Sequence, residues 1–267
     1  MEWTDIVIPA VIFAGLGLLF GAALAIASRI FAVQEDERVG KITEALPGAN
    51  CGGCGYSGCA AYAAAIVKGE AAPGLCLACS AEGARVISEV MGVPVVENKP
   101  MRAQVMCSGK SGVAHKKYHY VGATDCVAAE RLGGGDKCCP NGCIGLGTCA
   151  AACPYDAIAV VDGLAVVDAG KCRGCGVCVS NCPKHIIHMI PAAATHWVAC
   201  LSVENGKKTR EQCDAGCISC RLCEKACEHD AIKVDNFVAA IRYDKCVGCG
   251  ACADKCPRHI IHFVTRS

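Results

Sequence analysis

Two cysteine runs decide the fold: residues 217–227 read CISCRLCEKAC, and residues 246–257 read CVGCGACADKCP. Each run spaces four cysteines as C-x2-C-x2-C-x3-C. Thiolates at such short intervals can bind one metal centre from a single loop. Eight of them in two matched runs are more than a zinc ribbon needs, and the pattern is typical of a segment that binds two [4Fe-4S] clusters.

The ligands of these two clusters follow from the way in which paired runs share them. Three cysteines of a run bind one cluster and the fourth binds the cluster of the other run, as in bacterial two-cluster ferredoxins. One ligand set is therefore Cys217, Cys220, Cys223 and Cys256, and the other is Cys227, Cys246, Cys249 and Cys252. The β-like segment after each run is expected to pair into a small sheet beside the clusters.

An earlier copy of the pattern lies 74 positions upstream, since this interval separates Cys153 from Cys227 and Cys182 from Cys256. The copy predicts one cluster on Cys153, Cys172, Cys175 and Cys178. Its other ligand set is incomplete, because Leu146 occupies the position that matches Cys220. Cys139 is the nearest substitute, with its neighbour Cys138 as the alternative, and the expected set is Cys139, Cys143, Cys149 and Cys182.

A separate group of cysteines near the amino terminus has the spacing C-x2-C-x4-C-x16-C, within NCGGCGYSGC at residues 50–59. By number alone, its four thiolates could hold zinc or an iron–sulfur cluster. The interspersed glycines let a tight loop surround a bulky cluster, which favours iron and sulfide. The predicted ligands are Cys51, Cys54, Cys59 and Cys76.

These five clusters use 20 of the 26 cysteines and leave Cys79, Cys107, Cys126, Cys138, Cys200 and Cys213. Two of the remaining cysteines, Cys126 and Cys200, are again 74 positions apart. We hypothesise a sixth cluster between the two repeats, on Cys107, Cys126, Cys200 and Cys213. The competing interpretation is that these four are buried free thiols.

An apolar stretch of 21 uncharged residues runs from Ile6 to Ile26 and is long enough, as a helix, to span roughly 30 Å of membrane. Ala-Ile-Ala before Ser28 resembles a signal-peptide cleavage site, but no basic segment precedes the apolar run. Basic residues such as Arg38 and Lys41 follow it. The positive-inside rule therefore predicts a single membrane anchor with the remaining chain in the cytoplasm, where thiols stay reduced.

Composition excludes several functions. The chain has 26 basic and 25 acidic residues, and only 5% of its residues are aromatic. Neither the charge needed to neutralise phosphates nor the rings needed to stack bases are present, so we expect no nucleic-acid partner. No phosphate-binding glycine loop follows a strand, and no catalytic side chains stand out. The predicted chemistry is electron transfer through metal centres alone.

The expected architecture is an α+β chain with one amino-terminal transmembrane helix, a small [4Fe-4S] domain and two tandem lobes that are like two-cluster ferredoxins. The expected boundaries are 1–30 for the anchor, 31–90 for the first cluster domain, 91–125 for a connector, 126–195 for the first lobe and 196–267 for the second lobe.

A single amino-terminal crossing, then C-x2-C-x4-C-x16-C, then ferredoxin-type runs, resembles the B-type subunit of the Rnf complex, a membrane-bound ferredoxin:NAD+ oxidoreductase. The resemblance covers essentially the whole chain, and the doubled ferredoxin pattern looks like the form found in anaerobic bacteria such as clostridia and acetogens. It implies a location on the cytoplasmic side of the cell (inner) membrane. It also implies electron input from soluble ferredoxin, and partner subunits that are embedded in the membrane or bind flavin and NAD.

Two other functions compete with this interpretation. One is an iron–sulfur relay subunit of another membrane redox complex, of the hydrogenase or dehydrogenase type. The other is a metal-storing or zinc-structural scaffold without electron transfer, and a zinc protein would be colourless. If the chain does receive electrons from an acidic ferredoxin, we expect docking near Lys184, Lys255 or Arg258, where cations lie beside cluster ligands.

Overall fold

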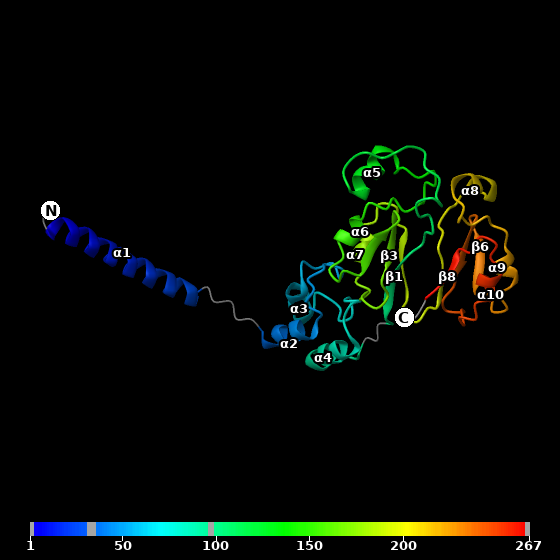
Figure 1. Cartoon of the computed structure of the whole chain (residues 1–267). Coiled ribbons are helices and arrows are strands. Elements are labelled where there is room, and N and C mark those ends of the chain that lie inside the picture. The colour runs from blue at the N-terminus through cyan, green and yellow to red at the C-terminus, as the bar shows by residue number, and fades with distance from the viewer. Residues whose placement is uncertain (1–2, 31–35, 96–98, 265–267) are drawn as a thin grey trace.

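A computed structural model describes residues 3–30, 36–95 and 99–264 of the chain. Small parts of the expected anchor, first cluster domain, connector and second lobe therefore lie outside the described residues, namely 1–2, 31–35, 96–98 and 265–267. The described chain is a mixture of helices and short antiparallel strands, with one apolar helix at the amino-terminal end (Figure 1).

The amino-terminal helix α1 (Trp3–Ile30) has 28 residues and lies apart from the cysteine-rich body (Figure 1). Its segment Val11–Ser28 has a mean hydropathy of 2.3, and none of that segment is buried within the structure. A helix of this length and composition can cross a bilayer, because its backbone hydrogen bonds are satisfied internally and its side chains favour lipid over water. The structure confirms the predicted apolar helix.

A small helical unit follows and contains α2 (Glu37–Ala45), α3 (Cys59–Lys68) and α4 (Ala81–Met91). Local sequence sets the helix ends: the Ser80 hydroxyl accepts the Gly83 N–H at the start of α4, a cap worth about 1 kcal/mol. Gly92 ends α4 in the left-handed conformation, at φ 64°. The three helices enclose a core centred on Ile42, Tyr62 and Ile66.

A first sheet unit contains two antiparallel pairs, β1 with β4 and β2 with β3. Asp162 and Gly163 form the two-residue turn between β2 and β3, with positive φ at both positions as a tight hairpin requires. Short helices carry several of the cysteines. The elements are β1 (Met101–Val105), α5 (Cys126–Gly133), α6 (Thr148–Ala151), β2 (Ile158–Val161), β3 (Leu164–Val167), α7 (Val177–Ser180) and β4 (Ile187–Pro191).

A second sheet unit repeats this plan, with β5 paired to β8 and β6 paired to β7. Strands β6 and β8 begin 74 positions after β2 and β4, so the structure confirms the internal repeat. The elements are β5 (His196–Val198), α8 (Gly206–Gln212), α9 (Leu222–Lys225), β6 (Ile232–Asp235), β7 (Val238–Ile241), α10 (Ala251–Asp254) and β8 (Ile261–Phe263).

The expected connector 91–125 is not wholly a connector. Its residues 101–105 form β1, which pairs along its whole length with β4 and contributes the buried side chains of Ala103 and Val105. The physical reason is that β4 would otherwise leave an unpaired edge, and β1 supplies both the missing hydrogen bonds and apolar cover.

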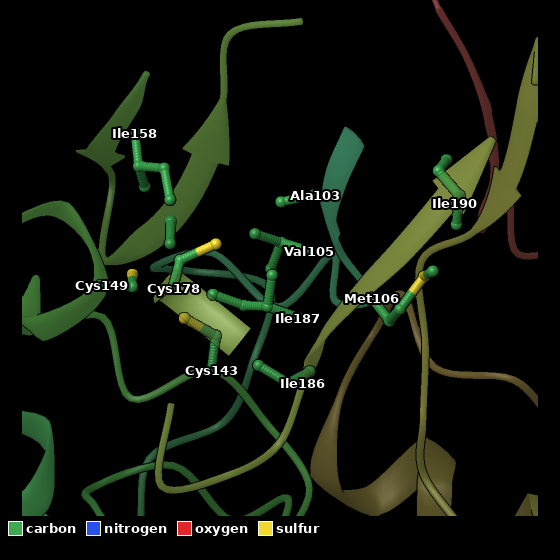
Figure 2. Packing of buried hydrophobic residues seen from close by; sticks show 11 residues of the cluster. Ala103, Val105, Met106, Cys143, Cys149, Ile158, Cys178, Ile186, Ile187 and Ile190 are labelled. Atoms are coloured by element: carbon green, nitrogen blue, oxygen red, sulfur yellow. The ribbon is translucent and has the colours of Figure 1, made fainter. Parts of the chain in front are cut away.

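Cysteine side chains form part of each core. In the first sheet unit, the thiols of Cys143, Cys149 and Cys178 lie among the side chains of Val105, Ile158 and Ile187 (Figure 2). Full burial of an isoleucine contributes about 1.5–3 kcal/mol, and each unit has only a few such residues. Whatever binds the thiols must therefore supply much of the remaining stability.

Candidate metal centres

All 26 cysteines are free in the structure, and four sets of them line cavities. Within residues 3–30, 36–95 and 99–264, no three Cys, His, Asp or Glu side chains lie close enough together to bind a single metal ion. The thiols of four sets instead surround a cavity, and those of the other two sets influence one another electrostatically.

The amino-terminal set agrees with the sequence grouping, since Cys51, Cys54, Cys59 and Cys76 line one cavity. The loop that carries them is held by Asn50, whose side-chain oxygen accepts the Cys59 N–H at 2.8 Å. Gly52 and Gly55 adopt φ values of 71° and 89°, which glycine tolerates and other residues rarely adopt. These turns direct three thiols of one short loop toward a common space.

The amino-terminal loop contacts the first sheet unit. Cys175 lines the same cavity, and a Cβ placed on Gly53 would lie only 2.3 Å from the Cys175 carbonyl oxygen. The Tyr155 phenol is buried nearby, and burial, followed by the charges of Cys51 and Cys175, raises the pKa of Tyr155 to about 12. Two cysteine sets from separate units are therefore direct neighbours.

A second cavity is lined by Cys126, Cys143, Cys149 and Cys182, so the structure brings Cys126 to the place where the sequence grouping expected Cys139. Cys126, rather than Cys139, takes the position left open by Leu146. The reason lies in how α5 is anchored: the Asp125 carboxylate accepts the Thr148 hydroxyl at 2.8 Å, and that hydroxyl accepts the Cys126 N–H at 2.7 Å. This pair of bonds holds the start of α5 against α6, where Cys149 lies.

A third cavity, between the two sheet units, is lined by Cys107, Cys139, Cys200 and Cys213. This set differs from the hypothesised sixth set by the same exchange, with Cys139 in place of Cys126. Backbone amides already point at two of its sulfurs: Gly109 N–H donates to the Cys107 Sγ at 3.3 Å, and Cys217 N–H donates to the Cys200 Sγ at 3.4 Å.

The three remaining sets agree with the sequence grouping. Cys227, Cys246, Cys249 and Cys252 line a further cavity. In the other two sets the thiols are near enough to influence one another electrostatically. Cys178 is influenced by Cys172, Cys175 and Cys153, and also by Cys149 of the neighbouring set, and Cys223 is influenced by Cys217, Cys256 and Cys220. Amides again face sulfur, because Ala157 N–H donates to the Cys153 Sγ at 3.4 Å and Ala231 N–H donates to the Cys227 Sγ at 3.3 Å.

The buried cysteines have raised thiol pKa values, whereas reactive cysteines have lowered ones. Burial raises the pKa of Cys149, Cys178, Cys200 and Cys223 to about 12, and that of Cys76 to about 11. A buried thiolate needs a positive partner, and bound iron supplies it. Sets of four thiolates with amides directed at sulfur are the donors that iron–sulfur clusters use. The residues present thus fit [4Fe-4S] clusters.

Two cysteines lie outside all six sets. The Cys79 thiol points toward the Ala45 carbonyl oxygen at 3.9 Å, and the Cys138 N–H donates to the His115 carbonyl at 2.7 Å in a backbone bridge. The structure places Cys126 and Cys139 each in the cavity where the sequence grouping expected the other. One signal in the sequence pointed to this placement. Cys126 and Cys200 are repeat partners, but only the first copy lacks a ligand, at Leu146, so Cys126 is the cysteine that can replace it.

Comparisons with known families agree with this geometry. A 4Fe-4S dicluster domain matches residues 216–261, 4Fe-4S binding domains match residues 140–156 and 165–188, and an Fe-S cluster family matches residues 46–78. Several iron–sulfur domains are thus arranged along one chain. Together, fold and sites define an iron–sulfur electron-relay protein with an amino-terminal apolar helix.

Relatives identify the family. The chain is 46% identical to the B-type subunit of the Na(+)-translocating ferredoxin:NAD(+) oxidoreductase complex of Acetobacterium woodii, over 96% of this chain and 77% of that protein. It is 39% identical to the B-type subunit of the ion-translocating oxidoreductase complex of Methanosarcina acetivorans, over 94% of this chain and 95% of that protein. It is also 39% identical to the B-type subunit of the proton-translocating ferredoxin:NAD(+) oxidoreductase complex of Clostridium ljungdahlii, over 94% and 90%. The chain belongs to the family of B-type subunits of these Rnf complexes.

Proposed function

We propose that this chain is the electron-input subunit of an ion-translocating ferredoxin:NAD+ oxidoreductase complex, and that it relays electrons from soluble ferredoxin to the other subunits. The observation that carries the proposal is the contact between successive cysteine sets, most directly between Gly53 and Cys175. A chain of neighbouring metal centres is what electron relay requires, whereas a storage or structural scaffold has no need for such contacts.

We assign six ligand sets, four with the residues expected from the sequence and two that differ from the expected sets because Cys126 and Cys139 change places. When bound, each [4Fe-4S] cluster accepts and releases one electron. The residues that would hold the clusters are Cys51, Cys54, Cys59 and Cys76; Cys126, Cys143, Cys149 and Cys182; Cys153, Cys172, Cys175 and Cys178; Cys107, Cys139, Cys200 and Cys213; Cys217, Cys220, Cys223 and Cys256; and Cys227, Cys246, Cys249 and Cys252.

The two sheet units correspond to two tandem ferredoxin-like lobes, each with two clusters. The register of the strands supports this, because Ile187 of β4 and Ile261 of β8 are repeat partners and pair with Val105 and Val198 respectively. The set on Cys107, Cys139, Cys200 and Cys213 draws ligands from both lobes, so its cluster would fix the distance between them.

The helix α1 anchors the protein to the cell membrane as a single crossing, with the cysteine-rich body on the cytoplasmic side. The length and hydropathy of α1 support the crossing. The basic residues Arg38 and Lys41 after the helix support the orientation, because cations are retained on the cytoplasmic side. A reducing cytoplasm also suits a protein whose cysteines are all free.

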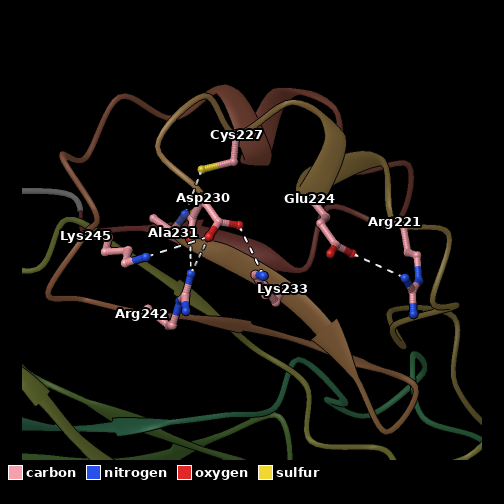
Figure 3. A network of polar contacts seen from close by, with 8 residues as sticks. All are labelled: Arg221, Glu224, Cys227, Asp230, Ala231, Lys233, Arg242 and Lys245. Atoms are coloured by element: carbon pink, nitrogen blue, oxygen red, sulfur yellow. Dashed lines mark hydrogen bonds and ion pairs between the residues drawn. The ribbon is translucent and has the colours of Figure 1, made fainter.

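Ferredoxin docks on the second sheet unit in this proposal. Two cysteines there, Cys220 and Cys249, are exposed to solvent, which brings their clusters close to a partner. Asp230 is surrounded by three cations, with Arg242 at 2.8 Å, Lys233 at 3.4 Å and Lys245 at 3.7 Å (Figure 3). These three cations are partly exposed and offer contacts to an acidic partner.

The docking residues expected from the sequence are mostly engaged elsewhere. Lys184 is 9% exposed and forms a 2.6 Å ion pair with Glu130. Arg258 donates to the Cys213 carbonyl oxygen at 2.8 Å, so it acts within the protein. Lys255 is exposed and remains a docking candidate.

The experiment that tests the function mixes the anaerobically purified chain with reduced soluble ferredoxin and follows the visible absorption of both proteins by stopped flow. We expect the chain's broad visible band to bleach as ferredoxin is reoxidised. A chain that contains clusters but takes no electrons from ferredoxin would contradict electron input at this point and favour a relay position further along the complex.

A further inference from the structure

The two sheet units contain equivalent cluster sites, and one of the differences between them lies on the strand beside each site. In the first unit, Ala103 of β1 pairs with Met189 of β4. In the second unit, His196 of β5 pairs with Phe263 of β8, and Met189 and Phe263 are repeat partners. Ala103 and His196 therefore occupy the same place, although no 74-residue interval relates them in the sequence.

His196 is placed to act on the cluster site of the second unit. Its side chain lines the cavity of Cys227, Cys246, Cys249 and Cys252, and the residue is only 5% exposed. Its ring packs edge-on against Phe263, with ring centroids 4.5 Å apart. A Cβ on Gly250, the residue after Cys249, would lie 3.4 Å from the imidazole Nε2. In the first unit, the equivalent position on Gly176 would meet nothing within 4 Å.

The hydrogen bonding of the ring leaves one donor without a protein partner. Nδ1 lies 2.7 Å from the Thr195 hydroxyl. If that hydroxyl donates to Nδ1, the ring proton is on Nε2. Nε2 is buried and has no hydrogen-bond partner among the residues that the structure describes. A buried N–H without an acceptor is costly, so a group inside the cavity must accept it.

We propose that the His196 Nε2–H donates a hydrogen bond to a sulfur of the cluster held by Cys227, Cys246, Cys249 and Cys252, and thereby raises the reduction potential of that cluster. This proposal rests on the cluster assignment of the proposed function. The physical reason is that the reduced cluster carries one more negative charge, so the donor stabilises it more than the oxidised cluster. His196 is a positioning residue and not a ligand, since the set already has four thiolates.

The effect of His196 on the reduction potential must be measured by changing His196 itself and not by comparing the two units. The first unit has a buried cation, Arg102, that also affects the potential. The guanidinium of Arg102 is buried near Cys172. Burial lowers the pKa of Arg102, and the negative charge of the Cys172 thiolate acts in the opposite direction. Absolute potentials of the two equivalent clusters therefore differ for more than one reason. A change at His196 alone isolates the effect of the hydrogen bond.

The test is a redox titration of the full-length protein, followed by electron paramagnetic resonance, on the wild type and on His196→Ala, which copies the first unit. We expect one cluster to become harder to reduce, with its reduced-to-oxidised ratio at a fixed potential about tenfold lower, a shift of about 59 mV for one electron. The iron content should stay unchanged. His188→Ala removes an exposed histidine from β4 and serves as the matched control, with no shift expected.

A second measurement protects the test against misfolding of the variant. Thr195→Val removes the hydroxyl partner of Nδ1 while the ring remains, and we expect a smaller shift in the same direction. With ¹⁵N-labelled histidine, pulsed resonance should show a weak nitrogen coupling that His196→Ala abolishes and His188→Ala preserves.

Unchanged midpoints in both the His196 and Thr195 variants would overturn the proposal. A strong nitrogen coupling in the wild-type protein that His196→Ala abolishes would also overturn it, because that result would make the imidazole an iron ligand. Absence of iron in the wild-type protein would instead refute the proposed function itself, so the two failures are distinguishable.

Discussion

Gly53 contacts the backbone of Cys175, so closely that a Cβ at position 53 would lie 2.3 Å from the Cys175 carbonyl oxygen. This contact joins the amino-terminal helical unit to the first sheet unit at their cysteine loops. A glycine is needed here for close approach rather than for an unusual φ, because φ of Gly53 is not positive. The contact sets the distance between two ligand sets.

Gly53→Ala should separate these units, since the carbonyl oxygen belongs to backbone and cannot rotate away. We expect electron transfer between the cluster of the amino-terminal set and the cluster of the set that contains Cys175 to become several-fold slower. The iron content should be retained. Rapid-mixing kinetics with reduced ferredoxin would measure the loss as a delayed reduction of one cluster. Gly40→Ala in α2 is the control: it meets nothing within 4 Å and should stabilise the helix by up to about 1 kcal/mol. Equal kinetics in the two variants would exclude the contact as a determinant of transfer.

The assignment of Cys126 to the cavity of Cys143, Cys149 and Cys182 predicts which cysteine variants lose iron. Cys126→Ala should remove about four irons and the spectrum of one cluster within the first sheet unit, because Cys126 lines that cavity with Cys143, Cys149 and Cys182. Cys138→Ala should leave the iron content unchanged, since Cys138 lies outside all six sets. Iron analysis with resonance spectra measures both. Full iron in Cys126→Ala together with a loss in Cys138→Ala would be inconsistent with the grouping.

Cys139→Ala addresses the set between the two sheet units. We expect the loss of about four irons and looser attachment of the units, seen as faster proteolysis between residues 107 and 200. The complete protein should contain about 24 irons, six clusters of four. Spectroscopy that detects five clusters, with unchanged iron in Cys139→Ala, would show that Cys107, Cys139, Cys200 and Cys213 are free thiols.

Charge reversal in the patch around Asp230 tests ferredoxin docking. Lys245→Glu replaces one of the three cations near Asp230 and should slow association with an acidic ferredoxin by about tenfold at low ionic strength, with a weaker dependence on salt. Lys68→Glu changes the same charge on α3, far along the chain from this patch, and should have little effect. Similar rates for both variants at every salt concentration would place the docking surface elsewhere.

Much of the architecture was predictable from the sequence because cysteine spacing is a local signal. The cysteines expected to form the amino-terminal set and both sets of the second unit lie near one another, and the 74-residue repeat reappears in strands β2 and β6. Two features were not predictable in this way. Strand β1 joins its sheet through pairing with β4, more than 80 positions along the chain, and Cys126 reaches its set only because Asp125 and Thr148 hold α5 against α6.

Removal of the clusters should unfold the cysteine-rich body. The sheet units have few fully buried side chains, and buried thiols with a pKa of about 12, such as Cys149 and Cys223, provide metal ligands rather than strong apolar packing. Chelation of iron under anaerobic conditions should therefore abolish the β signal in circular dichroism while the apolar helix α1 keeps its helical signal. Retention of a cooperative thermal transition after complete iron removal would contradict this dependence.

The most direct measurement for the central claim is the iron and acid-labile sulfide content of the anaerobically purified protein, combined with its reduction by reduced ferredoxin. The account predicts about 24 irons and as many sulfides per chain, a brown protein, and bleaching when reduced ferredoxin is added. A colourless protein that holds zinc or no metal, and that leaves reduced ferredoxin unoxidised, would contradict the claim that this chain is an electron relay.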